Sequence, residues 1–191
     1  WAGYSNTTGN YNSFLGTWAG YSDTTGHRNS FLGMQAGYDV TEGFSNTLLG
    51  YNTGRGITTG DKNTIVGANV AGLAADLSNN IILADGDGNV RLQVDGSGNV
   101  GIGTTNPTVT LDVYKSSAGY VSQIHNDSVS GYGLLVRTDA NDVTRPILDL
   151  QGNSTTSRLY VASSGNIGVG TTNPLAQLEL NGLNSANLRL G

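Results

Sequence analysis

The chain has 191 residues, a formal net charge of -5 and a sequence pI near 4.7. It contains 29 Gly, 21 Asn, 21 Thr and 17 Ser but only 2 Lys, 2 Glu and 1 Met, and this shortage of helix formers excludes a helical bundle or a coiled coil. The acidic balance argues against nucleic acid and anionic membrane surfaces, which select basic patches. No apolar run approaches the ~18 residues needed to span a bilayer, and the absence of Cys excludes disulfides and Cys-ligated zinc.

Residues 1–84 carry a period of 17 residues, in five rows without an insertion. One column holds Asn in every row: Asn12, Asn29, Asn46, Asn63 and Asn80. Two adjacent columns hold an apolar pair in every row: Phe14 and Leu15, Phe31 and Leu32, Leu48 and Leu49, Ile65 and Val66, and Ile82 and Leu83. A fixed period of this kind predicts a stacked repeat architecture.

Seventeen residues are too few for two packed helices, and Gly recurs twice in most rows. The period suits one coil of a β-solenoid, with short strands such as NSFLG and WAGY joined by turns such as TTGN. Stacked coils lie ~4.8 Å apart, so the Asn column is expected to form an amide ladder. Neighbouring strand residues point to opposite faces, so each apolar pair places one side chain inside and one outside. The outer column predicts an interface, and the fifth row, with VAGLAADLS, is expected to form a helical turn that caps the solenoid.

A second motif follows and occurs twice, at residues 95–113 and 162–180. Each copy predicts a Gly-Asn turn and a short strand, with Val100 and Ile102 in the first copy and Ile167 and Val169 in the second. Gly residues alternate with these apolar residues, and Gly in a strand indicates close backbone approach. We expect chains that meet near a common axis to supply that neighbour. An Asn-Pro corner then precedes a second strand.

These patterns divide the chain into four segments. Residues 1–84 hold the five solenoid repeats, 85–113 a strand–turn connector with the first motif, 114–161 a small β module, and 162–191 the second motif and the start of a further module. The small module has strand-like runs at 133–137, 146–150 and 158–161 and is too thin to be stable without a symmetric partner. Trp1 opens in mid-pattern without an initiator Met, which indicates a piece of a longer chain.

The 17-residue rows resemble the repeats of phage tail-fibre proteins and, more loosely, the head repeats of trimeric autotransporter adhesins, which build a left-handed β-roll. The GNVGIGTTNP…LDV block resembles the shaft sequence found upstream of endosialidase-type intramolecular chaperone domains. Together these resemblances cover the chain except residues 114–157. They imply an all-β, intertwined homotrimeric fibre on a virion or outside the cell. The chaperone domain and a receptor-binding tip are expected outside this sequence.

Several columns and turns are candidate binding sites. The aromatic residues of the first rows offer a surface for sugar stacking, or a ladder of rings that simply pack on one another: Trp1, Tyr4, Trp18, Tyr21 and Tyr38. Asp85, Asp87 and Asn89 begin like a calcium loop, but Val90 stands where the loop needs Gly, so a turn is favoured. GIGTTN lacks the third Gly and the helix of a phosphate-binding loop. The Thr column is expected to serve the turns, and the two His residues are expected to lie on the surface. We expect no metal and no cofactor.

We therefore expect a structural and adhesive segment of a homotrimeric phage tail fibre. Its partners are itself, other virion or tail proteins, and a host glycan or protein receptor contacted through the tip; no nucleic acid and no membrane insertion are expected. The fibre of a contractile injection system and a trimeric bacterial adhesin are the alternatives. A polysaccharide depolymerase with paired carboxylates is a more distant one, because no pair is singled out among Asp23, Asp139, Asp142 and Asp149.

Overall fold

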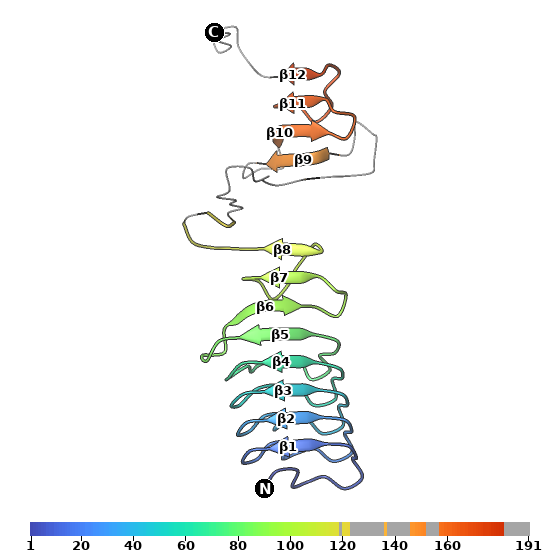
Figure 1. The fold of residues 1–191 in the computed structure, drawn as a ribbon, viewed down its shortest axis with the longest axis vertical. Coiled ribbons are helices and arrows are strands. Elements are labelled where there is room, and N and C mark those ends of the chain that lie inside the picture. The colour runs from blue at the N-terminus through green and yellow to red at the C-terminus, as the bar shows by residue number, and fades with distance from the viewer. Residues whose placement is uncertain (119, 123–135, 137–145, 152–156, 182–191) are drawn as a thin grey trace, which may run out of the picture. The chain divides into compact units, whose positions relative to one another are not determined.

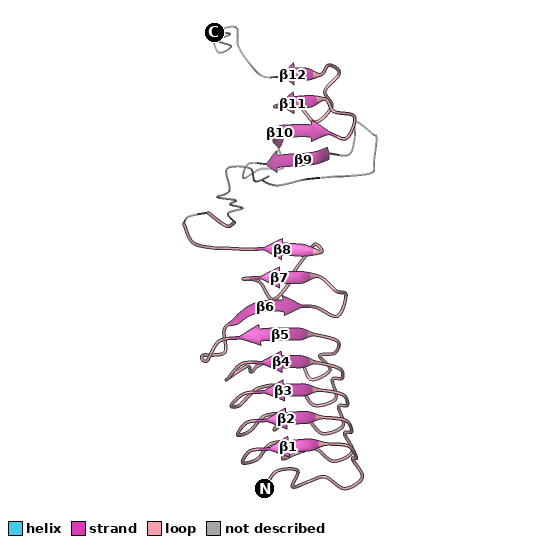
Figure 2. Cartoon of the chain, in the orientation of Figure 1, coloured by secondary structure: helices cyan, strands magenta, loops and turns pink. Residues whose placement is uncertain are grey.

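A computed structural model of the chain describes residues 1–118, 120–122, 136, 146–151 and 157–181. Over these residues the protein is all-β, with no helix and with twelve strands in two mixed sheets (Figure 1, Figure 2). The chain forms two compact units, Trp1–Gln123 and Ile124–Gly191. The first holds an eight-stranded sheet and the second a four-stranded sheet.

Each 17-residue row contributes one strand to the first sheet, and these five strands lie side by side in chain order (Figure 1). They are β1 (Ser13–Leu15), β2 (Ser30–Leu32), β3 (Thr47–Leu49), β4 (Thr64–Val66) and β5 (Ile81–Ala84). All neighbouring pairs are parallel, and every residue lies opposite the residue 17 positions later. The offset between paired residues of neighbouring strands is therefore equal to the 17-residue period of the sequence.

Only one strand forms in each row, so the expected strand at WAGY is wrong. Trp1–Tyr4 and its equivalents form turns, because two of their columns adopt the left-handed backbone conformation. Trp18 has φ 60° and Gly20 has φ 58°, values that break an extended strand. A further left-handed column contains Tyr11 and its equivalents just before each strand, and these bends return the chain to the next row.

The interior of the first unit is built from the inner member of each apolar pair. Its largest buried apolar side chains come from two sources. The strands supply Phe31, Leu48, Ile65 and Ile82, and the turn segments supply Val40, Ile57 and Val70. Phe14 packs against this cluster from the first row, and its ring stacks on that of Phe31 with centroids 5.1 Å apart. Each row thus supplies only a few apolar side chains, and their stacking makes a continuous core.

The expected helical turn in the fifth row is also wrong. Ala75 and Asp76 form a hydrogen-bonded turn, and Leu77 donates its N–H to the carbonyl of Ala74. The parallel series nevertheless ends here, as expected, because β6 (Val90–Val94) runs antiparallel to β5. β7 (Val100–Ile102) is antiparallel to β6, and β8 (Leu111–Val113) is parallel to β7.

The second unit has the strand order β12-β11-β10-β9. Its strands are β9 (Pro146–Gln151), β10 (Ser157–Ala162), β11 (Ile167–Val169) and β12 (Leu178–Leu180). The pairs β9–β10 and β10–β11 are antiparallel, and β11–β12 is parallel. β9 and β10 contain two of the strand-like runs expected between residues 133 and 161, and β10 reaches from the third expected segment into the fourth. The run at 133–137 lies almost wholly outside the described residues.

Candidate functional site

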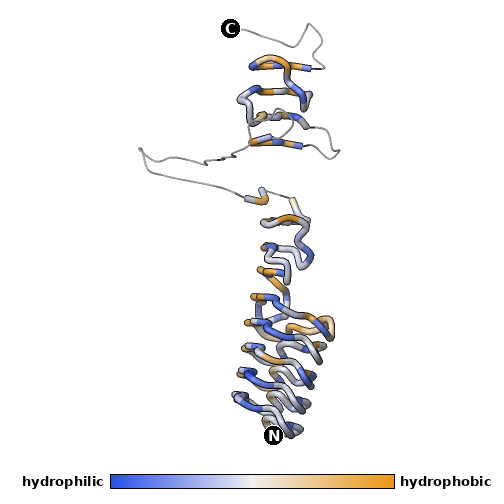
Figure 3. Tube along the Cα trace, turned by 90° about the vertical axis from the view of Figure 1, so that its right-hand side faces the viewer, coloured by the Kyte–Doolittle hydropathy of each residue, from blue (hydrophilic) through white to orange (hydrophobic). Residues whose placement is uncertain are grey.

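The sheet of the first unit carries one apolar column on its outer face. In each row the first member of the apolar pair is turned inward, and the second is turned outward, as the alternation predicts. Leu15 exposes 69% of its surface and Leu49 40%, whereas Leu48 is fully buried. Figure 3 shows hydrophobic segments recurring one above another along these rows. The outer column is formed by Leu15, Leu32, Leu49, Val66 and Leu83.

This apolar column continues past the last row. Leu83 lies opposite Leu92 of β6, which is followed by Ile102 and Val113. The second outward column changes from polar to apolar residues along the sheet. It holds Ser13, Ser30, Thr47 and Thr64 in β1–β4, and Ile81, Val94, Val100 and Leu111 in β5–β8. The outer face is therefore half apolar over β1–β4 and fully apolar over β5–β8. Sequence reasoning singled out Val100 and Ile102 and predicted the second strand that contains Leu111 and Val113, but it missed the neighbours on β6.

Behind the sheet, the Asn column forms the expected amide ladder. The Oδ1 atom of Asn29 accepts the backbone N–H of Asn46 at 2.9 Å, and its Nδ2 donates to the Gly43 carbonyl at 2.7 Å. The same two bonds recur along the column, although the second goes to Leu77 in place of Gly from Asn63. These side chains are buried from Asn29 onward, so the ladder satisfies polar groups inside the unit.

The aromatic column lies beside the sheet and forms a stack of rings. Tyr21 lies between Tyr4 and Tyr38, with ring centroids 5.2 Å apart on each side and interplanar angles of 6° and 5°. Arg55 extends the stack with its guanidinium 4.7 Å from the Tyr38 ring centre, and pairs with Asp39 at 2.8 Å. Stacking on a sugar requires an open ring face, and both faces of Tyr21 are occupied by its neighbours. The column is thus organised first as a packing ladder.

Trp1 and Trp18 lie in the column three positions before the Tyr column. Trp1 exposes 78% of its surface and makes a tilted contact with Tyr4 at 5.7 Å, while Trp18 exposes 38%. Among the five aromatic candidates, Trp1 and Tyr4 are the most exposed. Contact of this column with a glycan stays a prediction.

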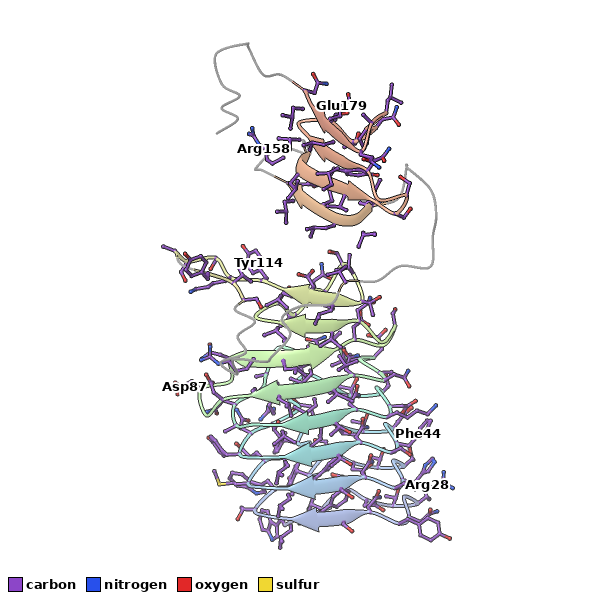
Figure 4. All side chains as sticks on the ribbon, turned by 45° about the horizontal axis from the view of Figure 1, so that its top comes forward. Arg28, Phe44, Asp87, Tyr114, Arg158 and Glu179 are labelled. Carbon is purple, nitrogen blue, oxygen red and sulfur yellow. The ribbon has the colours of Figure 1, made fainter. Side chains whose placement is uncertain are left out.

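A second stack of side chains was not predicted. The His27 ring stacks on Phe44 with centroids 5.1 Å apart and an angle of 4°, and the Lys62 ammonium lies 5.7 Å from the Phe44 ring centre. Figure 4 shows Phe44 and Arg28 on the side where the strands of the rows begin, whereas Asp87 lies on the side where β5 ends. The signal was present in the sequence, because these three residues fall in two adjacent columns of the 17-residue rows.

The turn at Asp85 is stabilised by its own carboxylate. The Oδ1 atom of Asp85 accepts the backbone N–H groups of Asp87 and Asn89, each at 3.0 Å. The Asn89 amide and Arg91 also bind this carboxylate, and together these contacts lower the pKa of Asp85 to about 2. Asp95 occupies the same place in the next hairpin and binds the backbone of Asn99, which lowers its pKa. A turn is therefore what forms, and in the described part of the chain no three or more His, Cys, Asp or Glu side chains are grouped so that they could hold a metal ion.

Asp23, one of the four carboxylates considered for a depolymerase, is a buried side chain. It is fully buried, at a position where the next two rows hold Val40 and Ile57. Its Oδ1 accepts the backbone N–H of Gly26 at 2.8 Å, and burial raises its pKa above the usual 3.8. Asp139 and Asp142 lie outside the described residues.

The Gly residues of the second motif approach the backbone of their own chain. A Cβ atom on Gly101 would lie 2.5 Å from the carbonyl oxygen of Thr104, and one on Gly168 would lie 2.4 Å from that of Thr171. The expectation that other chains supply this neighbour is wrong. The loop that follows β7 or β11 folds back over its own strand, and Gly leaves room for it.

The Thr column is used within the turns. Thr7, Thr24 and Thr41 each donate the hydroxyl to the carbonyl of the equivalent Thr in the next row.

In the described segments no helix is long and apolar enough to cross a membrane. Comparison with protein-family models and with curated proteins finds no match for this chain.

Proposed function

We propose that this chain is a structural segment of a homotrimeric fibre, in the manner of a phage tail fibre that presents a receptor-binding tip to a host cell. In this proposal the five 17-residue rows form a β-solenoid, and three chains bury their outer apolar columns around a common axis. The strand-rich segments after residue 84 continue the shaft.

The outer apolar column carries the proposal. Five residues in register, from Leu15 to Leu83, are an uninterrupted apolar stripe on a face where the alternate column is Ser or Thr in the first four rows and Ile81 in the fifth. Stripes of this kind on soluble proteins mark contacts with other chains. A rotation axis parallel to the stripe would bring the same residues of each copy together. The threefold number comes from the resemblance of the repeats to trimeric fibre proteins.

The internal ladders suit a stiff shaft. Asn, Thr, Tyr and apolar columns each join one row to the next, so bending the rows apart would break several contacts at once. A shaft needs no catalytic group. Its contribution is reach and the simultaneous presentation of several tips, which multiplies weak contacts through avidity.

Fibres of contractile injection systems and trimeric surface adhesins would use the same physics. Tail and baseplate genes next to the coding sequence would support a phage or an injection particle, and a membrane-anchor domain in the full reading frame would support an adhesin. A depolymerase would shorten capsular polysaccharide on incubation, and we expect the glycan to keep its length.

The direct test is the mass of the chain in solution by light scattering. We expect three times 19.8 kDa, and a stable monomer would overturn the proposal. Leu49→Glu should break the assembly because it places a charge in the apolar column. Thr47→Glu is the matched control, since Thr47 is on the same strand and face but in the polar column; this variant should keep the mass of the wild type.

A further inference from the structure

The chain contains one four-stranded module twice. β5–β8 and β9–β12 have the same strand order and the same antiparallel, antiparallel and parallel pairings. Residues paired in the first set recur 67 positions later in the second: Leu83 with Leu92 becomes Leu150 with Leu159. The duplication therefore begins at β5 and is longer than the motif visible in the sequence.

The two faces of each module differ sharply in polarity. On one face all eight positions are apolar in both copies, the first copy holding Ile81, Leu83, Leu92, Val94, Val100, Ile102, Leu111 and Val113, and the second Leu148, Leu150, Leu159, Val161, Ile167, Val169, Leu178 and Leu180. The other face is mixed: it holds Ile82, Gln93, Gly101 and Asp112 in the first copy and Asp149, Tyr160, Gly168 and Glu179 in the second.

Over the last two strands of each module, this mixed face is covered by the module's own loop. Gly101 contacts the Thr104 carbonyl, Pro107 is buried, and the Asp112 carboxylate accepts the N–H and hydroxyl of Thr108. The second copy repeats the arrangement, with Pro174 buried and Glu179 accepting the N–H of Leu175 at 2.7 Å. Within each unit, the apolar face is the one left open: Leu111 exposes 60% of its surface and Leu178 57%.

We propose that each module is a self-association element whose apolar face binds the same face of other copies of this chain. The inference rests on the proposed function in taking the partner to be a further copy. It adds that assembly is encoded twice after residue 80, first in a module that shares β5 with the fifth 17-residue row and again in the second unit, and it assigns the contact to the Val, Leu and Ile face.

Three observations favour another copy of the chain as the occupant. A symmetric contact brings identical residues together, which suits a face with no charged side chain at any of its eight positions. The face recurs at a fixed interval of 67 residues, and another copy offers partners at that same interval. Eight side chains, several of them near half exposure, amount to several hundred Å², on the order of the ~800 Å² per partner that stable interfaces bury.

Single thiols distinguish the occupants, because the chain has no Cys. The test variants are Leu111→Cys and Leu178→Cys, which lie on the apolar faces at equivalent positions. The matched controls are Ser97→Cys and Ser164→Cys, exposed turn residues that are also 67 positions apart. Each purified full-length variant is weighed by light scattering, labelled with a maleimide, and oxidised before denaturing electrophoresis.

We expect the two test thiols to react about tenfold more slowly than the control thiols, because labelling must wait for the interface to open. On oxidation, Leu111→Cys and Leu178→Cys should each give a covalent dimer, and the controls should stay single chains. A disulfide in a single-Cys variant can join only two copies. Slow labelling without any dimer would overturn the proposal and show instead that the two modules of one chain cover each other.

The remaining outcomes separate this proposal from the proposed function. If the variants have the trimer mass and the test thiols react as fast as the controls, the module faces are open; the inference then fails while the trimeric fibre stands. A monomer mass for all four variants and the wild type would overturn both.

Discussion

The Nε2 atom of Gln93 donates a hydrogen bond at 2.9 Å to Oδ1 of Asn80, and both side chains are buried. In the earlier rows that Oδ1 position accepts the backbone N–H of the next Asn. After Asn80 no further row follows, because β6 runs in the opposite direction. Gln93 therefore supplies the donor that ends the ladder.

Gln93→Leu should destabilise the first unit by ~1–3 kcal/mol, the cost of leaving a buried acceptor without a donor. Denaturant unfolding followed by circular dichroism gives the free energy of unfolding. Gln177→Leu is the control, since Gln177 is exposed and its replacement should change stability little. Equal effects at both positions would contradict the role given to Gln93.

Asp23→Asn should change how stability depends on pH. Burial raises the pKa of Asp23 above 3.8, so the folded state holds this proton more tightly than the unfolded state. The stability that the protonated group contributes is complete below pH 3.8 and is lost as pH rises through the raised pKa. The variant should therefore gain in free energy of unfolding relative to wild type as pH increases from 3.8 upward. A constant difference across that range would show that the carboxyl titrates normally.

Thr53→Val should stabilise the chain by ~1 kcal/mol. Thr53 is fully buried, and within the described residues its Oγ1 has no hydrogen-bond partner; replacing the hydroxyl by a methyl group removes that desolvation cost. The next row holds buried Val70 in the same column. Thr24→Val is the opposite case, because the Thr24 hydroxyl donates to the Thr41 carbonyl at 2.9 Å, and it should lower the melting temperature where Thr53→Val raises it.

Gly101→Ala and Gly168→Ala should each destabilise the module that contains them by ~2 kcal/mol or more, since the new Cβ would meet a carbonyl oxygen of the same chain. Gly86→Ala should be neutral, because nothing lies within 4 Å of the Cβ position there. Thermal unfolding of the three variants provides the comparison. If Gly101→Ala unfolds like the wild type, the loop over β7 is not tightly packed.

Sequence reasoning predicted the elements that a column can reveal. The strand at residues such as Phe31 and Leu32, its inward and outward alternation, and the ladder through Asn46 all follow from a repeated residue type at a fixed interval. The hairpin turn at Asp85 followed from local chemistry, because Asp-Gly pairs favour tight turns.

The features it missed depend on backbone direction and on contacts between different columns. Trp18 adopts a left-handed conformation that its residue type does not favour, so the residue types of WAGY predict a strand that does not form. The donor from Gln93 depends on the reversal of β6, which has no repeated column to announce it. The neighbour of Gly101 lies three residues ahead in a loop. The missing side chain of a Gly shows that another group approaches closely, but it does not show whether that group belongs to the same chain or to another copy.

The identity between sequence period and strand register also sets the units in which such a protein changes length. Removing or duplicating 17 residues would leave every column in place and shift the remaining rows by one strand spacing, ~4.8 Å. An insertion of any other size within a row would move Asn46 or its equivalents out of line with their acceptors. Natural variants of this segment are therefore expected to differ in length by multiples of 17 residues.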